Sequence, residues 1–378
     1  MRQLLDHSEA HVEAIVETTE ALVRLESPST DKLAVDRCGR ELAIRLQHAG
    51  AQVERLACDE RGDHLAARLD GTGEPVLLLG HFDTVWPIGT LERMPLRRAG
   101  PRLHGPGAFD MKAGIAIALG ALAALRGTGF THPPIHMLWT TDEEIGSGTS
   151  REAIEAAARQ AAAVLVLEPA LPGGALKTAR KGCGQFEITV EGVAAHAGVD
   201  PAKGASAIHE LAAQIAAIEQ WQDLERGVSV NVGVIEGGSR ANVVAEHARA
   251  IVDVRAPTMA DAAALDARCR SLQPLRRGTR LTIRGGFERP PLERTPSITH
   301  LFAIARDVAS LLGRDLKEGS TGGGSDGNFT AALGVPTLDG LGPVGDGAHA
   351  AHEHVDVEQL PWRAALVAGL LHRLASGL

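Results

Sequence analysis

Short apolar runs alternate with longer amphipathic stretches along the first half of the chain. Three of these runs, Pro75–Leu79, Ile135–Thr140 and Ala163–Leu167, are rich in Val, Leu and Ile. Such runs are typical of parallel strands that are buried on both faces of a sheet. Because stretches with helical spacing separate them, the pattern predicts a doubly wound α/β domain with a mixed sheet.

The other elements of this domain follow from the same periodicity and from breakers. Gly50, for example, ends an amphipathic stretch as a helix C-cap would. Helices are predicted at residues 7–25, 36–50, 113 onward, 151–161, 297–312 and 356–374, and further strands at 51–56, 64–69 and 335–338.

The pattern changes after Arg180. Strands predicted at 184–191, 228–235, 247–255 and 280–284 are interleaved with helices predicted at 204–219 and 259–272. This β-α-β-β-α-β order is ferredoxin-like. The sequence therefore predicts a first domain in two parts, 1–181 and 289–378, interrupted by an inserted domain at 182–288.

Histidine and acidic residues directly follow the three apolar strands. His81 and Asp83 follow the first strand, Glu143 and Glu144 the second, and Glu168 the third. Because the carboxyl ends of parallel strands meet at one edge of a sheet, we expect these side chains to lie close together. Imidazole and carboxylate groups are common ligands of divalent metals such as zinc.

Two loops supply further candidate ligands. Asp110 lies in RLHGPGAFDMKAG and His349 in GPVGDGAH. Taken alone, Asp110 could cap the next helix, and His349 could lie at the surface, as we expect of His352 and His354. The full set is too large for one tetrahedral zinc and fits two metals, about 3.5–4 Å apart, that share a carboxylate. The five candidate ligands are His81, Asp110, Glu144, Glu168 and His349.

Two more acidic residues have candidate catalytic roles. Asp83 is placed to accept a hydrogen bond from the second ring nitrogen of His81 and so to orient it. Adjacent side chains on an extended segment point in opposite directions. Glu144 can therefore bind metal while Glu143 remains free to act as the general base toward a bound water.

The composition narrows the class of protein. Of the residues, 44% are hydrophobic and 22% charged, as in ordinary soluble enzymes. The formal net charge of −9 argues against a nucleic-acid partner, which favours a basic face. The four cysteines are scattered without a Cys-x-x-Cys pair, which indicates free thiols in a reducing compartment.

The apolar and N-terminal segments also favour a protein that does not contact a membrane. The first residues, MRQLLDHSEAHVEAIVETTEALVRL, carry acids throughout and predict an amphipathic helix rather than a signal peptide. The most apolar stretch, Ala113–Leu125, is shorter than a membrane-spanning helix and contains glycines. We therefore expect a cytoplasmic protein without a membrane partner.

Six motifs occur in the order GHFDTV, GPGAFDMKAG, TTDEEIGS, LVLEPA, GGGSDGNF and GAHAAHE. In order and spacing they closely resemble the dinuclear zinc exopeptidase and aminoacylase family. Its members include bacterial folate-hydrolysing glutamate carboxypeptidase, acetylornithine deacetylase, succinyl-diaminopimelate desuccinylase and aminoacylase. The motifs extend from about His81 to Glu353, and Phe329 together with the Gly-Gly-Gly-Ser-Asp loop favours the glutamate carboxypeptidase branch.

The resemblance implies a division of the ligands between two zinc ions per subunit. In it, His81 and Glu168 bind one ion, and Glu144 and His349 bind the other. Asp110 bridges both and is often followed by a cis peptide bond that does not involve proline. Cobalt or manganese could take the place of zinc in such a site.

The resemblance also assigns roles outside the metal ligands. Asp83 orients a ligand, and Glu143 is the general base and then the general acid. The inserted domain is a dimerisation or lid domain of a homodimer. His196, in VEGVAAHAG, corresponds to a histidine that reaches the partner subunit's site and steadies the oxyanion. As an alternative, His196 is an ordinary loop histidine.

A substrate carboxylate needs a cation and N–H donors. Arg289 corresponds to an arginine of the glutamate carboxypeptidases, and Asn242, Gly323, Gly324 and Ser325 are supporting candidates. The glycine loop lacks the Gly-Lys-[Ser/Thr] of a phosphate-binding loop, so nucleotide binding is not expected. Its alternative role is a tight turn before a short helix.

The sequence thus predicts a metal-dependent hydrolase of amide bonds next to a free carboxylate. Its substrates would be N-acyl amino acids, folate-like N-acyl glutamates or the carboxyl ends of short peptides. The alternatives are an aminopeptidase or dipeptidase, an N-acyl-amino-acid deacetylase and, remotely, a non-catalytic ligand-binding dimer.

Overall fold

The computed structural model describes residues 1–377 and contains two compact units. The first unit comprises Met1–Thr178, Arg294–Ser320 and Ser325–Leu378. The second comprises Ala179–Glu293 and Thr321–Gly324. The chain therefore leaves the first unit, forms the second and returns, and part of the glycine loop belongs with the second unit.

A six-stranded mixed sheet forms the centre of the first unit. β3 runs parallel to β6 and β7, and β14 runs parallel to β7, whereas β2 is antiparallel to β1 and β6. In sheet order the strands are β1 (Gln52–Leu56), β2 (His64–Leu69), β6 (Ile135–Thr140), β3 (Val76–His81), β7 (Ala163–Val166) and β14 (Thr337–Leu338). The three apolar runs of the sequence are thus the three neighbouring parallel strands β6, β3 and β7.

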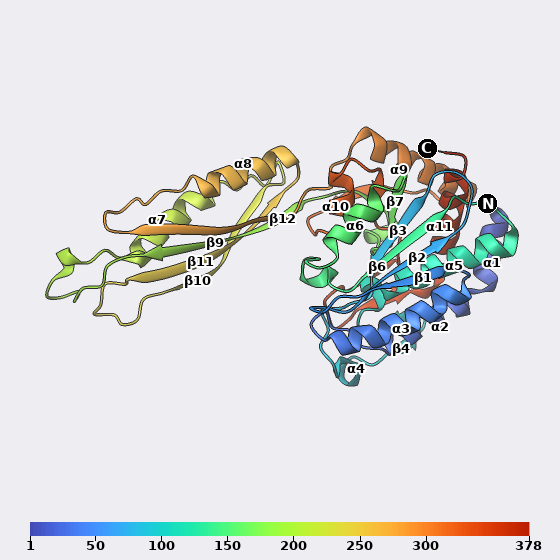
Figure 1. Cartoon of the computed structure of the whole chain (residues 1–378), viewed down its shortest axis with the longest axis horizontal. Helices are drawn as coiled ribbons and strands as arrows, with labels where there is room; N and C mark the ends of the chain where they lie inside the picture. Colours follow the sequence, from blue (N-terminus) through green and yellow to red (C-terminus); the bar gives the residue numbers. More distant parts are fainter. Residues whose placement is uncertain (378) are drawn as a thin grey trace. The chain divides into compact units, whose positions relative to one another are not determined.

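Helices cover both faces of this sheet (Figure 1). Leu78 of β3 belongs to the larger core, whereas its neighbours Leu77 and Leu79 belong to the core on the other face. The larger core includes α1 (Arg2–Ala10), α2 (Val12–Val23), α3 (Lys32–His48), α5 (Ala113–Thr128), α9 (Pro296–Leu311) and α11 (Leu360–Leu374). The smaller core includes α6 (Arg151–Ala158) and α10 (Gly327–Ala332).

The first helices differ from the prediction. The single helix predicted at 7–25 is two helices, because the backbone at His11 leaves helical geometry at φ −116° and ψ 21°. α3 begins at Lys32 rather than at residue 36, since the Asp31 carboxylate caps it by accepting from Ala34 N at 3.0 Å.

Several short elements were not predicted. One small sheet has the order β15 (Gly345–Asp346), β16 (His354–Asp356), β5 (Arg102–His104) and β4 (Arg97–Ala99), and another pairs β13 (Glu318–Thr321) with β8 (Leu176–Arg180). A four-residue helix, α4, spans Thr90–Arg93. The expectation of an exposed His354 was wrong, because that residue lies in β16 and is buried, with its ring 5.2 Å from that of His104.

Residues 108–128 correct a second expectation. This helical segment of 21 residues is long and apolar enough to cross a membrane, contrary to the reading of Ala113–Leu125 as too short. In the structure 78% of its most apolar window is buried inside the protein. Its apolar character is accounted for by burial, because α5 lies in the larger core with α1, α2 and α11.

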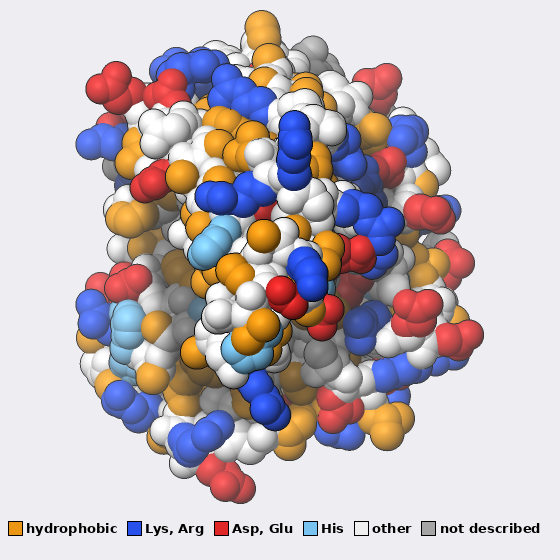
Figure 2. Space-filling view, turned by 90° about the vertical axis from the view of Figure 1, so that its left-hand side faces the viewer, with side chains coloured by type: hydrophobic (Ala, Val, Ile, Leu, Met, Phe, Trp, Pro, Cys, Tyr) orange, Lys and Arg blue, Asp and Glu red, His pale blue; other side chains and the backbone are white. Residues whose placement is uncertain are grey.

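The second unit is a four-stranded antiparallel sheet with two helices on one face (Figure 1). Its elements are β9 (Gly182–Glu191), α7 (Ala207–Glu219), β10 (Ser229–Gly237), β11 (His247–Ala256), α8 (Met259–Arg270) and β12 (Arg280–Arg289), and the sheet order is β10-β11-β9-β12. The chain order β-α-β-β-α-β is the one predicted. Figure 2 shows basic, acidic and apolar side chains intermixed over the face turned to the viewer.

β12 continues five residues beyond its predicted end. The strand passes through Gly285 and Gly286. Gly285 has φ +94°, and a Cβ there would lie 2.1 Å from Gln185 O of β9. Glycine is therefore needed because the two backbones approach closely, and Arg289 becomes the last residue of a strand.

Candidate metal centre and active site

The five predicted ligands come from five different segments of the first unit. His81 is the last residue of β3, Glu144 lies in the turn Glu143–Ile145 after β6, and Glu168 lies two residues beyond β7. Asp110 lies in the irregular turn Ala108–Lys112 before α5, and His349 in the loop between β15 and β16.

These ligands converge in space. His81 Nε2 lies 3.4 Å from Asp110 Oδ1 and 3.3 Å from Glu168 Oε1. His349 Nε2 lies 3.4 Å from Asp110 Oδ2 and 3.0 Å from Glu144 Oε2. The two carboxylate oxygens of Asp110 therefore face different imidazoles, each of which has a second carboxylate beside it.

The spacing of these atoms fits metal ligands. Metal–ligand bonds of about 2.1 Å at tetrahedral angles place ligand atoms about 3.4 Å apart. Although buried, His81 Nε2, Asp110 Oδ1 and Glu144 Oε1 have no hydrogen-bond partner within residues 1–377. Buried polar atoms are seldom left unpaired, so these three atoms call for a shared partner such as a cation.

The electrostatics of the protein-only site also favour a cation. Burial alone would lower the pKa of His81, but Asp110, Asp83 and Glu168 raise that pKa well above its usual value. Asp110 and Glu144 raise the pKa of His349 to about 10. Burial and the charge of Asp110 raise the pKa of Glu144 to about 7. The carboxylates of this site therefore stabilise positive charge between them. A bound divalent metal would supply that charge.

Asp83 connects His81 to the Glu143–Glu144 turn. His81 Nδ1 lies 3.3 Å from Asp83 Oδ1 and 3.2 Å from the Asp83 backbone oxygen. The Asp83 carboxylate also accepts from Ser29 Oγ at 2.6 Å and, at longer range, from the backbone N–H groups of Glu143 and Glu144. This fully buried carboxylate can therefore hold the ring and the turn in one arrangement.

Glu143 lies within ligand distance of the same centre. One of its carboxylate oxygens, His81 and Glu168 offer atoms that all lie within 4.8 Å of one another. Glu143 can therefore reach a water or substrate atom held between His81 and Glu168, which is the geometry that a general base requires.

The backbone around Asp110 matches the expectation from the family resemblance. The Asp110–Met111 peptide bond is cis and does not involve proline. Within the same turn, Asp110 has extended rather than helical backbone geometry, with φ −112° and ψ 97°.

Glu353 is a residue whose role the sequence did not reveal. Its carboxylate is fully buried and accepts four hydrogen bonds, from the Trp86 Nε1 and from the backbone N–H groups of Gly107, Phe109 and Asp110, at 2.8–3.1 Å. Burial raises the pKa of Glu353, while these donors oppose that shift. It fixes the turn that presents Asp110. The one signal was its place in GAHAAHE, four residues after His349.

Asp326 supports the turn that carries Glu143 and Glu144. Its buried carboxylate accepts from Thr140 Oγ1 at the end of β6 and from Ser147 Oγ beyond the turn, at 3.0 and 2.5 Å. Ser147 has a left-handed backbone with φ 57°, which returns the chain toward Asp326.

The predicted substrate residues fall into both units. In the second unit, the backbones of His196 and Asn242 lie side by side, since Ala197 N donates to Asn242 O at 2.9 Å, and both side chains are exposed. Arg289 is buried in the same unit, beside Gly324. Ser325 belongs to the first unit, where its buried hydroxyl donates to Asp339 at 2.6 Å and holds the loop.

Comparison with known proteins identifies the family. A family model described as "Peptidase family M20/M25/M40" matches residues 77–373. The chain belongs to this family. It is therefore an M20-family hydrolase, and the matched region includes all five candidate ligands.

Other M20-like proteins align over nearly the whole chain. Carboxypeptidase G2 from Pseudomonas sp. (strain RS-16) is 29% identical over 382 residues, which cover 96% of this chain and 90% of that protein. Succinyl-diaminopimelate desuccinylase from Stenotrophomonas maltophilia (strain K279a) is 31% identical over 385 residues, covering 96% and 99%. The crystal structure of aminopeptidase PepT from Bacillus cereus ATCC 10987 shares the fold, with a TM-score of 0.79 at 24% identity and coverage of 96% and 99%.

Proposed function

We propose that this M20 hydrolase uses two divalent metal ions to cleave an amide bond next to a free carboxylate. The observation that carries the proposal is the carboxylate of Asp110, whose two oxygens face His81 and His349 separately. A shared carboxylate between two imidazole–carboxylate pairs suits a two-metal site better than a single ion. The names of the relatives, a carboxypeptidase and a desuccinylase, support substrates of this class.

The same five side chains would hold the ions. His81 and Glu168 would bind one, Glu144 and His349 the other, and Asp110 both. Zinc suits these nitrogen and oxygen ligands, as do cobalt and manganese. When bound, such ions polarise a substrate carbonyl and lower the pKa of a water.

The side chains around the centre then supply the proton transfers and orientation. Glu143 takes a proton from the attacking water and later gives it to the leaving amine. Asp83 accepts a hydrogen bond from Nδ1–H of His81. It thereby keeps His81 in the tautomer whose Nε2, beside Asp110, is unprotonated and free to bind a metal. His196 would donate a hydrogen bond to the oxyanion in the partner subunit of a homodimer formed through the inserted unit.

Binding of the substrate carboxylate is assigned to the second unit. Arg289 supplies the cation, and Asn242 with Gly323 and Gly324 supplies further polar contacts. The substrate is a small N-acyl amino acid or short peptide in the cytoplasm, with neither nucleic acid nor membrane as partner.

A hydrolysis screen tests the substrate class. The zinc-loaded protein is assayed with one acyl group on glutamate, aspartate, alanine, phenylalanine, arginine and ornithine, and with unblocked dipeptides as the comparison. We expect turnover of acylated amino acids, with glutamate preferred and with activity lost on chelation. Preference for unblocked dipeptides would replace the proposal with an aminopeptidase or dipeptidase, and no hydrolysis would favour the non-catalytic dimer.

The role of Glu143 has its own test. Glu143→Ala should still bind two metal ions per chain but lose about 10²- to 10⁴-fold in kcat, because the proton acceptor is removed. Metal content is measured by elemental analysis beside the kinetics. Glu152→Gln, an exposed change on α6, is the matched control and should keep full activity. Retained turnover in Glu143→Ala would remove Glu143 from this role.

A further inference from the structure

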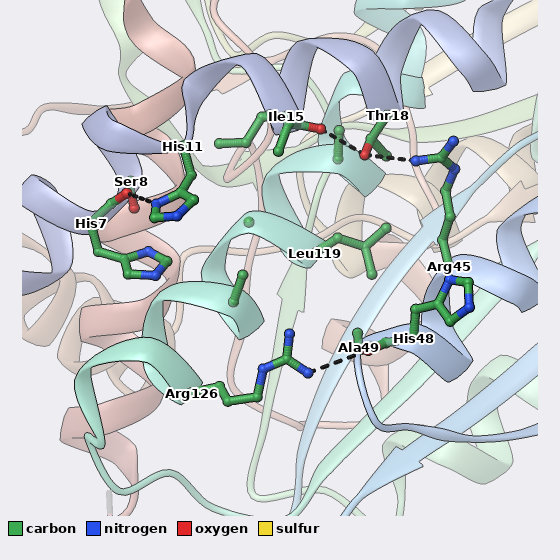
Figure 3. Close-up of a pocket in the computed structure, with 14 residues that line it drawn as sticks. His7, Ser8, His11, Ile15, Thr18, Arg45, His48, Ala49, Leu119 and Arg126 are labelled. Atoms are coloured by element: carbon green, nitrogen blue, oxygen red, sulfur yellow. Dashed lines mark hydrogen bonds between the residues drawn. The ribbon is translucent and has the colours of Figure 1, made fainter.

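A hollow in the first unit lies between α1, α2, α3 and α5 (Figure 3). Its volume is about 320 Å³, at the lower end of the range of small-molecule sites. None of the residues that line it is a candidate ligand or catalytic residue of the metal centre. The proposed hydrolase reaction therefore leaves this hollow without a role.

The floor of the hollow is apolar and is formed by residues of α5. It consists of Ala116, Leu119, Gly120 and Ala123. Gly120 also lets Ile15 of α2 approach, since a Cβ at that position would lie 2.9 Å from Ile15 Cδ1. Figure 3 shows Leu119 in the middle of the hollow, with polar side chains arranged around it.

Basic side chains surround this floor. They are His7, His11, Arg45, His48 and Arg126. No aspartate or glutamate is among the lining residues, although the whole chain has a formal net charge of −9. The formal positive charge of this lining is carried by Arg45 and Arg126, since histidine is counted as neutral at pH 7. A cationic group with no acidic residue in the same lining attracts anions.

The two arginines differ in how far their charge is compensated. Arg45 is paired with Glu41 at 2.7 Å and donates to Thr18 Oγ1 at 3.0 Å. Within residues 1–377, Arg126 contacts no carboxylate, and its guanidinium donates to the backbone oxygen of His48 at 3.3 Å. The uncompensated positive charge is therefore at Arg126, beside His48.

The lining also contains a buried polar atom without a partner in the described chain, the Nδ1 atom of His7. His7 and His11 stack with their ring centroids 4.1 Å apart, and His11 Nδ1 lies 2.8 Å from His7 O. His7 Nδ1 is buried and has no hydrogen-bond partner within the described chain. Such an atom calls for a partner outside the protein, either water or a polar group of a ligand.

We propose that this hollow binds a small organic anion, a carboxylate carried on a short apolar chain. The carboxylate accepts hydrogen bonds from Arg126 beside His48, and the apolar chain lies over Leu119 and Ala123. A bare inorganic anion would leave the floor uncovered, and a neutral apolar molecule would leave the charge of Arg126 uncompensated.

The probe for this proposal is 6-bromohexanoate, whose bromine reports its position. Because the metal centre also attracts carboxylates, the first measurement is bromine anomalous diffraction from soaked crystals. We expect a bromine peak over Leu119. In calorimetric titrations, 6-bromohexan-1-ol should bind at least about tenfold more weakly, since it cannot form the charge-assisted hydrogen bonds.

Two variants test the residues that carry the proposal. Arg126→Gln should weaken binding of 6-bromohexanoate about tenfold. Arg98→Gln removes an exposed arginine of the same unit outside the hollow and should leave the affinity unchanged. Ala123→Leu fills the floor and should abolish the bromine peak. A peak at the metal centre alone, equal binding of the alcohol, or full affinity in Arg126→Gln would each overturn the proposal.

Discussion

At the residue scale, the carboxylate of Asp110 determines how the two halves of the candidate centre are placed. Its two oxygens lie at the same distance, 3.4 Å, from the Nε2 atoms of His81 and His349. Those histidines are far apart in sequence and come from different segments. This carboxylate therefore relates the two halves of the candidate centre, and its orientation must be fixed by the residues around it.

Glu353 fixes the orientation of Asp110, because its carboxylate holds the backbone of the Asp110 turn. Replacing that carboxylate should therefore disturb the centre. In Glu353→Gln one carboxylate oxygen becomes an NH₂ group, which opposes the N–H donors of the Asp110 turn. We expect a loss of about 1–3 kcal/mol in free energy of unfolding, together with weaker metal retention. Urea unfolding and competition with a chelator measure the two effects.

Glu358→Gln serves as the control for that variant. Glu358 is an exposed residue five positions further along the chain. Its substitution should alter neither measurement. If Glu353→Gln retained metal as well as the unaltered protein does, the turn would hold Asp110 without this carboxylate.

At the residue scale, the sequence predicted the candidate metal ligands but did not predict the residues that hold them in place. His81, Glu144 and Glu168 have the residue types of ligands and follow apolar strands, so that pattern and chemistry agree. Glu353 instead bonds mainly to backbone N–H groups more than 200 positions earlier. Backbone donors have no signature in the sequence, so only the fold reveals that contact.

At the element scale, the contact between α5 and Leu167, the residue that follows β7, affects the spacing of the candidate centre. A Cβ on Gly114, in the first turn of α5, would lie 2.1 Å from the carbonyl oxygen of Leu167. Gly114 lies four residues after Asp110, and Leu167 immediately precedes Glu168. This close approach therefore brings the segments of two ligands together.

Gly114→Ala should separate these segments. We expect a loss of about 1–3 kcal/mol in stability from the overpacking and a fall in kcat with the displacement of Asp110 from Glu168. Thermal unfolding and kinetics are the measurements. Gly148→Ala is the control, because a Cβ there meets nothing within 4 Å. Unchanged kinetics in Gly114→Ala would show that the centre tolerates movement of α5.

A salt bridge between elements gives a prediction about pH. Arg294, just before α9, donates to Glu318 of β13 at 2.7 and 2.8 Å, and Thr178 of β8 donates to the same carboxylate at 2.6 Å. Hydrogen bonds from Arg294 lower the pKa of Glu318. A lowered pKa in the folded state contributes stability that is present above the unfolded value, near pH 4.5, and is lost as the pH falls further.

The stability difference between the unaltered protein and Glu318→Gln should therefore depend on pH. We expect at most about 1 kcal/mol at pH 7 and a smaller difference in acid, measured by urea unfolding at both pH values. Glu9→Gln, at an exposed position of α1, should show no such dependence. A difference that grows as the pH falls would contradict the assigned role of this pair.

Periodicity predicted long elements well and short ones poorly. The three parallel strands and α5 have continuous apolar runs, and such runs are buried only when they form the central elements of a domain. β15 contains only two residues, too few for any alternation to be visible, whereas β14 lies within the strand predicted at 335–338. The break at His11 has no signal in the sequence because its neighbours keep helical spacing. The strand predicted at 280–284 ends too early because β12 continues through Gly285 and Gly286.

At the scale of the whole molecule, the inserted unit has an open sheet edge. β10 is the outermost strand of the order β10-β11-β9-β12, and Val234 and Ile235 in it are 40% and 58% exposed. An exposed apolar edge strand readily pairs with another chain. Dimerisation through the inserted unit, predicted from the family resemblance, is consistent with this edge.

Ile235→Arg should weaken such a dimer. The added charge opposes its own copy across a symmetric interface, so we expect the mass from light scattering to fall from that of two chains toward one. Leu311→Arg changes a comparably exposed residue of α9 in the first unit and should leave the mass unchanged. A single-chain mass for the unaltered protein would contradict a homodimer.

The interruption of the first unit also has a consequence for protein synthesis. Glu168 leaves the ribosome before the inserted unit, whereas His349 follows it, with 180 residues between them. At about 5–20 residues per second, the nascent chain carries Glu144 and Glu168 for roughly 10–40 s before His349 is made. During that interval the carboxylate of Asp110 has only one of the two imidazoles that face it in the folded protein. A chain terminated within the inserted unit lacks His349 and cannot complete the centre. We therefore expect prematurely terminated chains to be inactive.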